Sequence, residues 1–417
     1  MKFDANKTTV CIVGLGYVGL PLAEVLAQHV KVIGFDVDST KVNELSQSNN
    51  QNLLVTDKPE EIGKADIIII CVPTPVTKSK EPDLSYVEKA AEVVGQNMKK
   101  GSIVILESTI YPGATEEIVA PILERESALK CGQDFKIAYC PERINPGDEE
   151  HTIDKVIKVV SGMDNETAEL VAELYRKIAL NVFKAKDIKT AEAVKVVENI
   201  QRDLNIALMN ELSLIFDKMG ISIKDVIEAA ATKWNFQRYS PGLVGGHCIP
   251  VDPYYLVYKA EKLGYHPQVI MAGRAINDYM PKHVVEMTIK ALKETGKVIK
   301  GSKVLIMGLT YKENVPDTRE TAAKEIINEL KEHGVQVLGY DPLLNNIEEE
   351  FGIPSLSSLE NILDIDGTVL LVAHKDFSGI TLNRLKGIMN ANPVLIDLRG
   401  AFAPQEAARE GIHYLSL

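Results

Sequence analysis

The sequence predicts an α/β protein made of two Rossmann-like, doubly wound lobes that are joined by a long central helix and a helical connector. Short apolar strand patterns alternate with helical patterns through about residue 185, which is typical of a parallel sheet covered by helices. A long helical pattern follows, and strand patterns return from Lys303. We therefore expect three regions, at residues 1–187, 188–295 and 296–417.

The first lobe is expected to begin with a buried parallel strand, because an apolar run rich in β-branched residues ends in glycine over Thr8–Gly16. The segment Leu20–Gln28 has a helical pattern. Further apolar runs follow and predict additional strands at Val30–Asp36, Ile67–Val72 and Ile103–Leu106.

The central helix is predicted over Thr190–Met219, where neither proline nor glycine interrupts the apolar periodicity. Such a helix is roughly 45 Å long, and Gly220 is a typical C-terminal stop. The second lobe starts with two strand patterns, Lys303–Leu309 and Val335–Asp341, which repeat the pattern of the first two strands. We interpret this as a weak internal duplication in which the second lobe lacks the full glycine pattern of the first.

The composition excludes several classes of partner. The chain has 417 residues, a net charge of −12 and five cysteines with no metal-binding or disulfide spacing. An acidic chain is a poor binder of nucleic acid or anionic membranes. No apolar run is long enough to span a membrane, and the first residues have no apolar signal-peptide core. We expect a cytoplasmic protein without a metal site.

A glycine pattern after the first strand predicts a dinucleotide site. Gly14, Gly16 and Gly19 fit GxGxxG between a strand and a helix, and Asp36 ends the next strand. These glycines allow a tight turn, close approach of a pyrophosphate and helix–strand packing. A carboxylate at Asp36 would bind the ribose hydroxyls and favour NAD over NADP. The alternative is a glycine-rich turn in an ordinary βαβ unit.

Two loops follow the later strands of this lobe, with Thr74 in one and Thr109 in the other. Ligands of open α/β sheets gather at the carboxyl ends of the strands, although proline and glycine also mark ordinary turns. Both loops are therefore candidate ligand loops.

A loop rich in glycine and proline, Pro241–Pro253, surrounds Cys248. Three glycines and three prolines in this stretch exclude regular structure. The thiol of Cys248 is therefore a candidate nucleophile, with His247 beside it and Asp252 four residues later. Cys11 and Cys71 lie in or next to apolar strands and are expected to be structural.

Together, these segments resemble the UDP-glucose/GDP-mannose dehydrogenase family over essentially the whole chain. The resemblance rests on the glycine pattern, Pro141-Glu142-Arg143, Asn210-Glu211-Leu212, Gly245-Gly246-His247-Cys248 and Asp317-Thr318-Arg319-Glu320. The segment around Tyr254-Tyr255 is most similar to the UDP-N-acetylhexosamine 6-dehydrogenase branch, and within it to the glucosamine/galactosamine type. Pro250 departs from the Gly or Ala that is frequent in related enzymes.

The resemblance implies a four-electron, two-NAD oxidation of the sugar C6 alcohol to a carboxylate through a thiohemiacetal and a thioester on Cys248. It implies a product that serves as a precursor of surface polysaccharide. The implied catalytic residues are Cys248, Lys195, Asn199, Asp252, Glu142 and Thr109. Lys195 and Asn199 share one face of the central helix, which could also be a merely solvated face.

The glycine pattern and the resemblance together imply two sets of binding residues. The expected cofactor-binding residues are Gly14, Gly16, Tyr17, Val18, Gly19, Asp36, Thr74, Thr109 and Arg319. The expected substrate-binding residues are Arg143, Arg202, Tyr239, Gly242, Gly245, His247, Arg274, Tyr311 and Lys312. Lys312 is the expected phosphate partner. Arg274 is expected to reach the neighbouring site of a homodimer or a dimer of dimers.

Three alternatives remain at this point. The same chemistry could act on UDP-N-acetylmannosamine or UDP-glucose. A redox-inert NAD-binding sensor could share the fold, but this chain retains Cys248, Lys195, Asn199 and Asp252. A two-electron β-hydroxyacid dehydrogenase would form one NADH per substrate and has no use for the cysteine loop or the second lobe. The sequence does not decide among the sugars, between dimer and tetramer, or which glycan receives the product.

Overall fold

The computed structural model describes residues 3–46, 50–143, 150, 152–360 and 362–417. Within these residues the chain forms two compact units. The first unit comprises Met1–Asn199 and Val251–Pro267, and the second comprises Ile200–Pro250 and Gln268–Leu417. The predicted three-region division, with boundaries at 187/188 and 295/296, stays a prediction.

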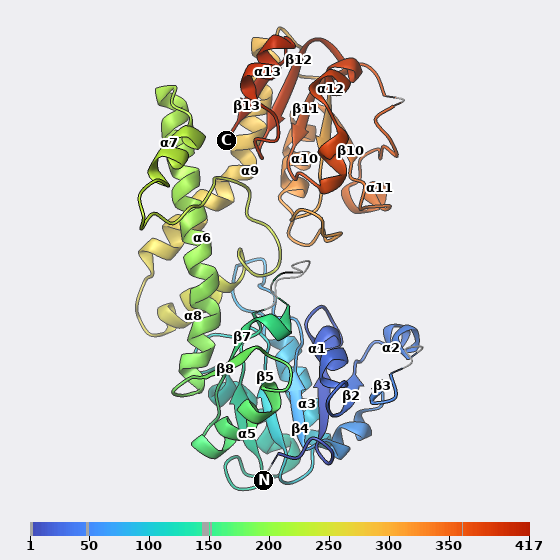
Figure 1. The fold of residues 1–417 in the computed structure, drawn as a ribbon, viewed down its shortest axis with the longest axis vertical. Helices are drawn as coiled ribbons and strands as arrows, with labels where there is room; N and C mark the ends of the chain where they lie inside the picture. The colour runs from blue at the N-terminus through green and yellow to red at the C-terminus, as the bar shows by residue number, and fades with distance from the viewer. Residues whose placement is uncertain (1–2, 47–49, 144–149, 151, 361) are drawn as a thin grey trace. The chain divides into compact units, whose positions relative to one another are not determined.

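A six-stranded parallel sheet forms the centre of the first unit (Figure 1). Its strand order, β3-β2-β1-β4-β5-β6, is that of the dinucleotide-binding Rossmann fold. The strands are β1 (Thr9–Val13), β2 (Lys31–Phe35), β3 (Leu53–Thr56), β4 (Ile67–Ile70), β5 (Ile103–Leu106) and β6 (Lys136–Tyr139). A separate parallel pair consists of β7 (Ile157–Val160) and β8 (Asn181–Lys184).

Helices connect the strands of the first unit, and one more, α8, comes from its separate segment Val251–Pro267. They are α1 (Gly19–Leu26), α2 (Ser39–Leu45), α3 (Ser85–Asn97), α4 (Ala120–Ser127), α5 (Asn165–Tyr175) and α8 (Asp252–Lys262). Shorter helical turns are η1 (Pro59–Lys64), η2 (Thr115–Val119) and η3 (Ile153–Lys155). The Asp38 carboxylate caps α2 by accepting from the backbone N–H groups of Thr40 and Lys41.

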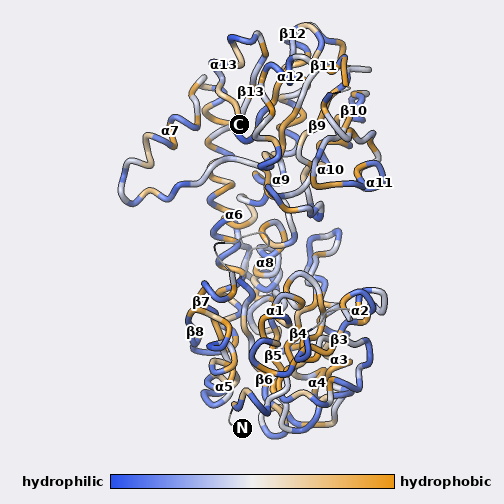
Figure 2. Tube along the Cα trace, turned by 45° about the vertical axis from the view of Figure 1, so that its right-hand side comes forward, coloured by the Kyte–Doolittle hydropathy of each residue, from blue (hydrophilic) through white to orange (hydrophobic). Residues whose placement is uncertain are grey.

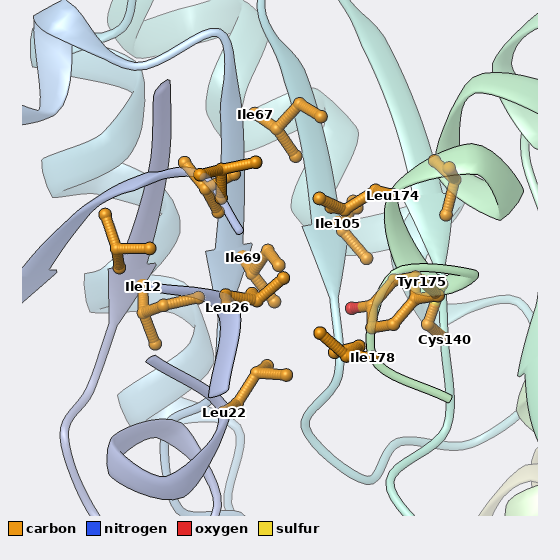
Figure 3. Packing of buried hydrophobic residues seen from close by; sticks show 14 of the residues in the cluster. Ile12, Leu22, Leu26, Ile67, Ile69, Ile105, Cys140, Leu174, Tyr175 and Ile178 are labelled. Carbon is orange, nitrogen blue, oxygen red and sulfur yellow. The ribbon is translucent and has the colours of Figure 1, made fainter. Parts of the chain in front are cut away.

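The core of the first unit explains why these strands are apolar throughout. All four isoleucines of β4 are completely buried, because helices cover both faces of a parallel sheet. Figure 3 shows Ile69 and Ile105 packing among Leu22 and Leu26 of α1 and Leu174 of α5. Figure 2 shows the same pattern along the chain, with hydrophobic stretches on the strands and hydrophilic ones on the outer turns.

The long helix α6 spans Ile188–Met219, close to the predicted range. At 1.5 Å per residue it is about 48 Å long. It ends at Gly220, whose φ of +68° favours glycine. The boundary between the two units falls within this helix, after Asn199.

The second unit contains a five-stranded parallel sheet in the order β10-β9-β11-β12-β13. The strands are β9 (Lys303–Met307), β10 (Gln336–Tyr340), β11 (Ile365–Leu370), β12 (Met389–Asp397) and β13 (His413–Ser416). Its helices are α7 (Ile223–Ala230), α9 (Gln268–Glu294), α10 (Ala323–Glu332), α11 (Ile347–Phe351), α12 (Leu382–Ile388), α13 (Pro404–Arg409) and the turn η4 (Lys375–Gly379). The predicted fold class, two Rossmann-like lobes with a long helix, is confirmed.

Candidate functional site

The glycine turn of the first unit leaves room for a ligand at one position and closes tightly at two others. Gly14 has a φ of +93°, and a Cβ there would lie 3.0 Å from the Cys71 carbonyl oxygen. A Cβ on Gly19 would lie 1.9 Å from the Gly14 carbonyl oxygen, so the start of α1 can pack here only as glycine. A Cβ on Gly16 would meet nothing within 4 Å. The open space at Gly16 suits close approach of a pyrophosphate, and Tyr17 and Val18 follow it.

Asp36, directly after β2, is hydrogen-bonded to the backbone of this glycine turn. Its Oδ2 accepts from the Leu15 N–H at 2.8 Å and from the Lys41 ammonium at 2.9 Å, and its Oδ1 accepts from the Asp38 N–H. Burial alone would raise the pKa of Asp36, but these donors lower it below its ordinary value. The group is therefore an anion at the position where a ribose hydroxyl can donate to it, and the residues fit a bound dinucleotide.

Two loops at the carboxyl edge of the same sheet contain the predicted threonines. Thr74 and Thr109 are both half-buried in the loops after β4 and β5. The Ser108 hydroxyl donates to the Val72 carbonyl at 2.7 Å and ties the two loops together. The Tyr255 hydroxyl donates to the Pro75 carbonyl at 3.0 Å. The predicted strand-end loops thus lie next to each other.

Three predicted catalytic residues of the first unit form one cluster. The Asn199 amide on α6 donates to Oδ2 of Asp252, the first residue of α8, at 2.5 Å. Asp252 is only 2% exposed. Burial raises the pKa of Asp252 to about 6, against the lowering effects of Lys195 and of the Asn199 bond. An acid with a pKa near neutrality is suited to accept and return protons.

Glu142, after β6, joins this cluster through its backbone. Its carbonyl oxygen accepts from the Lys195 ammonium at 2.9 Å. Its buried carboxylate accepts from the Arg143 N–H at 2.8 Å and from the Lys158 ammonium at 3.1 Å. The Arg143 side chain pairs with Glu198 at 2.8 Å.

Sequence reasoning missed Lys158, Glu107 and Tyr175, which lie buried behind Glu142. A signal for two of them was present. Lys158 stands within the otherwise apolar run of β7, and Glu107 directly follows the apolar strand β5. A charged side chain next to or inside a buried strand requires a partner.

The part of the cysteine loop up to Pro250 belongs to the second unit and packs on the loop after β9. A Cβ on Gly245 would lie 2.8 Å from the Glu320 carbonyl oxygen, and one on Gly246 would lie 2.7 Å from the Tyr311 ring. The His247 ring stands edge-on to Tyr311, with centroids 6.4 Å apart. The two glycines are therefore needed for close packing, and half-buried Cys248 follows directly in the same turn.

The start of this loop is fixed by a pair of hydrogen bonds. The Gly242 N–H donates to the Asn210 side-chain oxygen at 2.8 Å, and the Asn210 amide donates to the Gly242 carbonyl at 3.0 Å. The same amide also donates to Asn277 at 2.8 Å. Asn210 on α6 thereby anchors the segment that leads to the cysteine.

A pocket of about 200 Å³ lies beside this loop in the second unit. Its lining includes Gly245, Tyr311, Lys312, Arg399 and the start of α10 at Ala323. Glu313 also lines the pocket, but the two cationic side chains and a helix N-terminus still favour an anionic ligand such as a phosphate. Arg399 was not predicted, although it follows the apolar run of β12. Its guanidinium pairs with Glu313, with a shortest distance of 2.5 Å.

Other predicted residues are held in contacts of their own within the second unit. The Arg319 guanidinium pairs with Asp317 at 2.6 Å. Arg274 is 2% exposed and pairs with Asp203 at 2.6 Å and with Asp278. To reach another subunit its guanidinium would have to leave these carboxylates, and the reach of Arg274 stays a prediction.

The last two predicted substrate-binding residues lie on or next to the long helix. Arg202 is an exposed residue of α6. The Tyr239 hydroxyl donates to the Gln201 side chain at 3.2 Å. Their roles toward the substrate also stay predictions.

Comparison with known proteins assigns the family. The NAD binding domain of the UDP-glucose/GDP-mannose dehydrogenase family matches residues 8–52 and 46–179. The central domain of that family matches residues 189–279, and its UDP binding domain matches residues 305–404. The chain belongs to the UDP-glucose/GDP-mannose dehydrogenase family and is an NAD-dependent oxidoreductase.

Individual relatives cover nearly the full chain. A UDP-N-acetyl-D-glucosamine 6-dehydrogenase of Pseudomonas aeruginosa is 46% identical over 94% of this chain and 96% of its own. One of Salmonella typhi is 42% identical over 95% and 97%. A solved UDP-D-ManNAc dehydrogenase from Pyrococcus horikoshii has a TM-score of 0.88 and 29% identity, covering 98% of this chain and 99% of its own.

Among the residues that the structure describes, no group of three or more His, Cys, Asp or Glu side chains is arranged to hold a metal ion. Within that same part of the chain, no helix combines the length and apolar character needed to cross a membrane.

Proposed function

We propose that this chain oxidises the C6 alcohol of UDP-N-acetylglucosamine or UDP-N-acetylgalactosamine to the uronic acid, with two NAD consumed per sugar. The observation that supports it most directly is the packing of the Cys248 loop on Tyr311, next to the anion-suited pocket that contains Lys312. A nucleophilic thiol three residues from the pocket-lining Gly245 fits a nucleotide-sugar substrate better than a small hydroxy acid.

Gly14, Gly16, Gly19 and Asp36 would hold NAD, which when bound would supply the hydride acceptor for each of the two oxidation steps. After the first step, the thiolate of Cys248 adds to the C6 aldehyde carbon and forms a C–S bond. The Lys195 ammonium and the Asn199 amide stabilise the resulting oxyanion. Loss of the second hydride converts this thiohemiacetal into a thioester.

Water then attacks the thioester carbon, its proton passes to a carboxylate, and the C–S bond breaks to restore the thiolate. Glu142 and Asp252 are the proposed proton acceptors, and Thr109 is proposed to order the water. The sum is one alcohol, two NAD⁺ and one water giving one carboxylate, two NADH and three protons. Glu142 and Asp252 pass the protons that they accept on to solvent between steps.

The choice of sugar rests on similarity. The glucosamine 6-dehydrogenase relative is 46% identical over 406 residues, and a UDP-N-acetyl-D-mannosamine dehydrogenase of Methanocaldococcus jannaschii is 35% identical over 429 residues. The Tyr254-Tyr255 pair after Pro253 agrees with this preference. UDP-N-acetylmannosamine and UDP-glucose are the alternatives. We further propose a homodimer or dimer of dimers, and a product that serves as a precursor of surface polysaccharide or another glycan.

The test is the number of NADH formed per sugar consumed. UDP-N-acetylglucosamine, UDP-N-acetylgalactosamine, UDP-N-acetylmannosamine and UDP-glucose are offered in parallel to the wild type and to Cys248→Ala. We expect two NADH on a glucosamine or galactosamine substrate, and loss of that stoichiometry in the variant. One NADH per sugar, or full turnover without Cys248, would disprove the proposed chemistry.

A further inference from the structure

A group of buried charged side chains lies behind the Glu142 carboxylate, and the steps proposed above do not use it. The Lys158 side chain on β7 is 2% exposed. Its ammonium lies 3.1 Å from Oε2 of Glu142 and 3.0 Å from Oε1 of Glu107. One cation therefore serves two buried carboxyl groups from two different strand ends.

The remaining neighbours of Lys158 complete its surroundings. The Tyr175 hydroxyl contacts Glu107, and the Lys158 ammonium lies 5.0 Å from the centre of the Tyr175 ring. Figure 3 shows this ring among the buried residues beside Cys140. Burial raises the pKa values of the Cys140 and Cys71 thiols, so both are neutral. Lys158 is thus a cation that contacts both carboxyl groups.

The charges of Lys158 and Glu107 at neutral pH follow from this shared burial. Burial raises the pKa of Glu107 to about 7, with the Glu142 charge adding to it and Lys158 opposing it. Burial alone would lower the pKa of Lys158, but the two carboxylates raise it above its ordinary value. At neutral pH the cation is retained and Glu107 is the acid that readily takes a proton.

A buried ion cluster is weak evidence for stability, because apolar residues of similar volume often stabilise a fold as well or better. Packing therefore does not explain a lysine in an apolar strand. Its second partner, Glu142, is one of the two carboxylates to which the proposed function gives the proton of the attacking water. The Glu142 backbone also holds Lys195, at 2.9 Å from the carbonyl oxygen.

We propose that Lys158 is a positioning residue that keeps the Glu142 carboxylate ionised and in place for hydrolysis of the thioester. This inference rests on the proposed function and deepens it. Without the ammonium, a buried carboxyl group favours its neutral form, and a neutral Glu142 cannot take the proton of the attacking water. The first hydride transfer does not need that proton acceptor and is expected to persist.

The experiment compares Lys158→Met with the wild type and with Lys158→Arg in the full-length enzyme. For Lys158→Met we expect kcat to fall about 10²-fold, the usual contribution of a general base. We also expect the acidic limb of the kcat–pH profile of Lys158→Met to move up by at least one pH unit. Removing the neighbouring cation favours the neutral form of the Glu142 carboxyl group. Intact-protein mass spectrometry should show an acyl adduct on Cys248. Lys158→Arg keeps the charge and should restore the pH profile.

Lys136→Met is the matched control. Lys136 lies on β6 and its ammonium pairs with Asp164 at 2.7 Å, so the control also removes a lysine from an ion pair of this unit. Its pH profile should be that of the wild type. A folded Lys158→Met enzyme with the wild-type acidic limb and no adduct would overturn the inference.

Glu107→Gln keeps the inference testable if Lys158→Met does not fold. This change leaves Lys158 with Glu142 as its carboxylate partner in the group, so the acidic limb must stay or move to lower pH. A rise would count against the inference. The wild type serves a separate purpose, because failure to form two NADH per sugar there refutes the proposed function regardless of the variants.

Discussion

The two lobes repeat one strand–turn–strand arrangement and use its acid differently. In the first lobe the Leu15 N–H donates to Oδ2 of Asp36 at 2.8 Å, and in the second the Leu309 N–H donates to Oδ2 of Asp341 at 2.7 Å. The other carboxylate oxygen accepts from the residue two positions later in both cases, Asp38 and Leu343. The repeat proposed from sequence therefore extends to individual hydrogen bonds.

The lobes differ in what else contacts that acid. Asp36 is bound by Lys41, whose side chain is 39% exposed, whereas Asp341 is bound by the fully buried His374. His374 lies four residues after the end of β11, and Thr74 lies four residues after the end of β4. Its Nε2 donates to Asp341 at 3.1 Å, and its Nδ1 accepts from the Asn314 N–H at 2.9 Å.

The position of Gly16 shows the same divergence. Its counterpart after β9 is Thr310, a buried residue whose hydroxyl donates to the Lys312 carbonyl at 2.8 Å. In the second lobe, Thr310 occupies the space that a pyrophosphate would need, and the Asp341 carboxylate is hydrogen-bonded to His374. One backbone arrangement can therefore either hold a dinucleotide or brace a loop, depending on a few side chains.

The largest effect is expected from substituting one glycine in each lobe, Gly19 and Gly308, where a side chain would clash with the backbone. Gly19→Ala puts a Cβ 1.9 Å from Gly14, and Gly308→Ala puts one 2.2 Å from the Val372 carbonyl oxygen at a φ of +76°. Each should destabilise its own unit by about 3 kcal/mol. Gly19→Ala should abolish NAD binding and spare UDP binding, and Gly308→Ala should do the reverse.

Hydrogen exchange resolved along the chain, with calorimetric titration of NAD and UDP, measures both effects. Gly379→Ala is the control, because its Cβ would meet nothing within 4 Å. Equal loss of both ligands in both variants would show that the lobes do not act separately.

The next effect is a pH dependence that separates the buried acids of the two units. Burial raises the pKa of Asp252 to about 6, whereas His374 and backbone donors outweigh burial and lower the pKa of Asp341. A carboxyl group whose pKa is raised in the folded state stabilises the fold when the pH is below its pKa in the unfolded chain. For Asp252 this stabilisation is lost as the pH rises through its folded pKa of about 6. A carboxyl group whose pKa is lowered in the folded state, such as Asp341, stabilises the fold when the pH is above its pKa in the unfolded chain. That stabilisation is lost as the pH falls through its folded pKa.

Asp252→Asn should therefore raise the stability of the first unit at pH 8 by up to about 3 kcal/mol, since each pKa unit corresponds to about 1.4 kcal/mol. It should also lower kcat about 10²-fold, because a proton acceptor of the reaction is lost. Denaturant unfolding and kcat at pH 5 to 9 test this. A variant that is both less stable at pH 8 and fully active would contradict the assignment.

A smaller effect is expected from removing the two equivalent acids. Asp36→Ala should raise KM for NAD about tenfold or more by removing charge-assisted hydrogen bonds, and leave KM for the UDP-sugar unchanged. Asp341→Ala should leave KM for NAD unchanged and cost about 1–3 kcal/mol of stability, because the Leu309 N–H loses its acceptor. Steady-state kinetics and denaturant unfolding of both variants provide the measurements. The comparison fails if Asp341→Ala weakens NAD binding as much as Asp36→Ala does.

The sequence predicted what depends on local patterns. The apolar strands, α6 ending at Gly220, the GxGxxG turn and the loop position of Cys248 follow from period, glycine content and turn chemistry. Features that depend on long-range pairing were missed. Lys158 meets Glu107 and Glu142 only because separate strands end side by side.

The structure also gives predicted residues contacts that spacing along the chain does not specify. Nothing near Arg274 in the sequence showed that Asp203, 71 positions away, binds it. The contact between Lys195 and the Glu142 carbonyl likewise joins residues 53 positions apart. These long-range contacts depend on the packing of the fold.

The smallest effect is expected at Lys41, the exposed partner of Asp36. Its ammonium lies 2.9 Å from the carboxylate, but solvent reaches it, and exposed ion pairs contribute about 0–1 kcal/mol. Lys41→Met should therefore change KM for NAD less than about fivefold, since 1.4 kcal/mol corresponds to a factor of ten. Kinetics with NAD and NADP, at low and at 0.5 M salt, measure it. A tenfold rise in KM for NAD would mean that Lys41 holds Asp36 as firmly as His374 holds Asp341, and that the lobes differ less than their burial indicates.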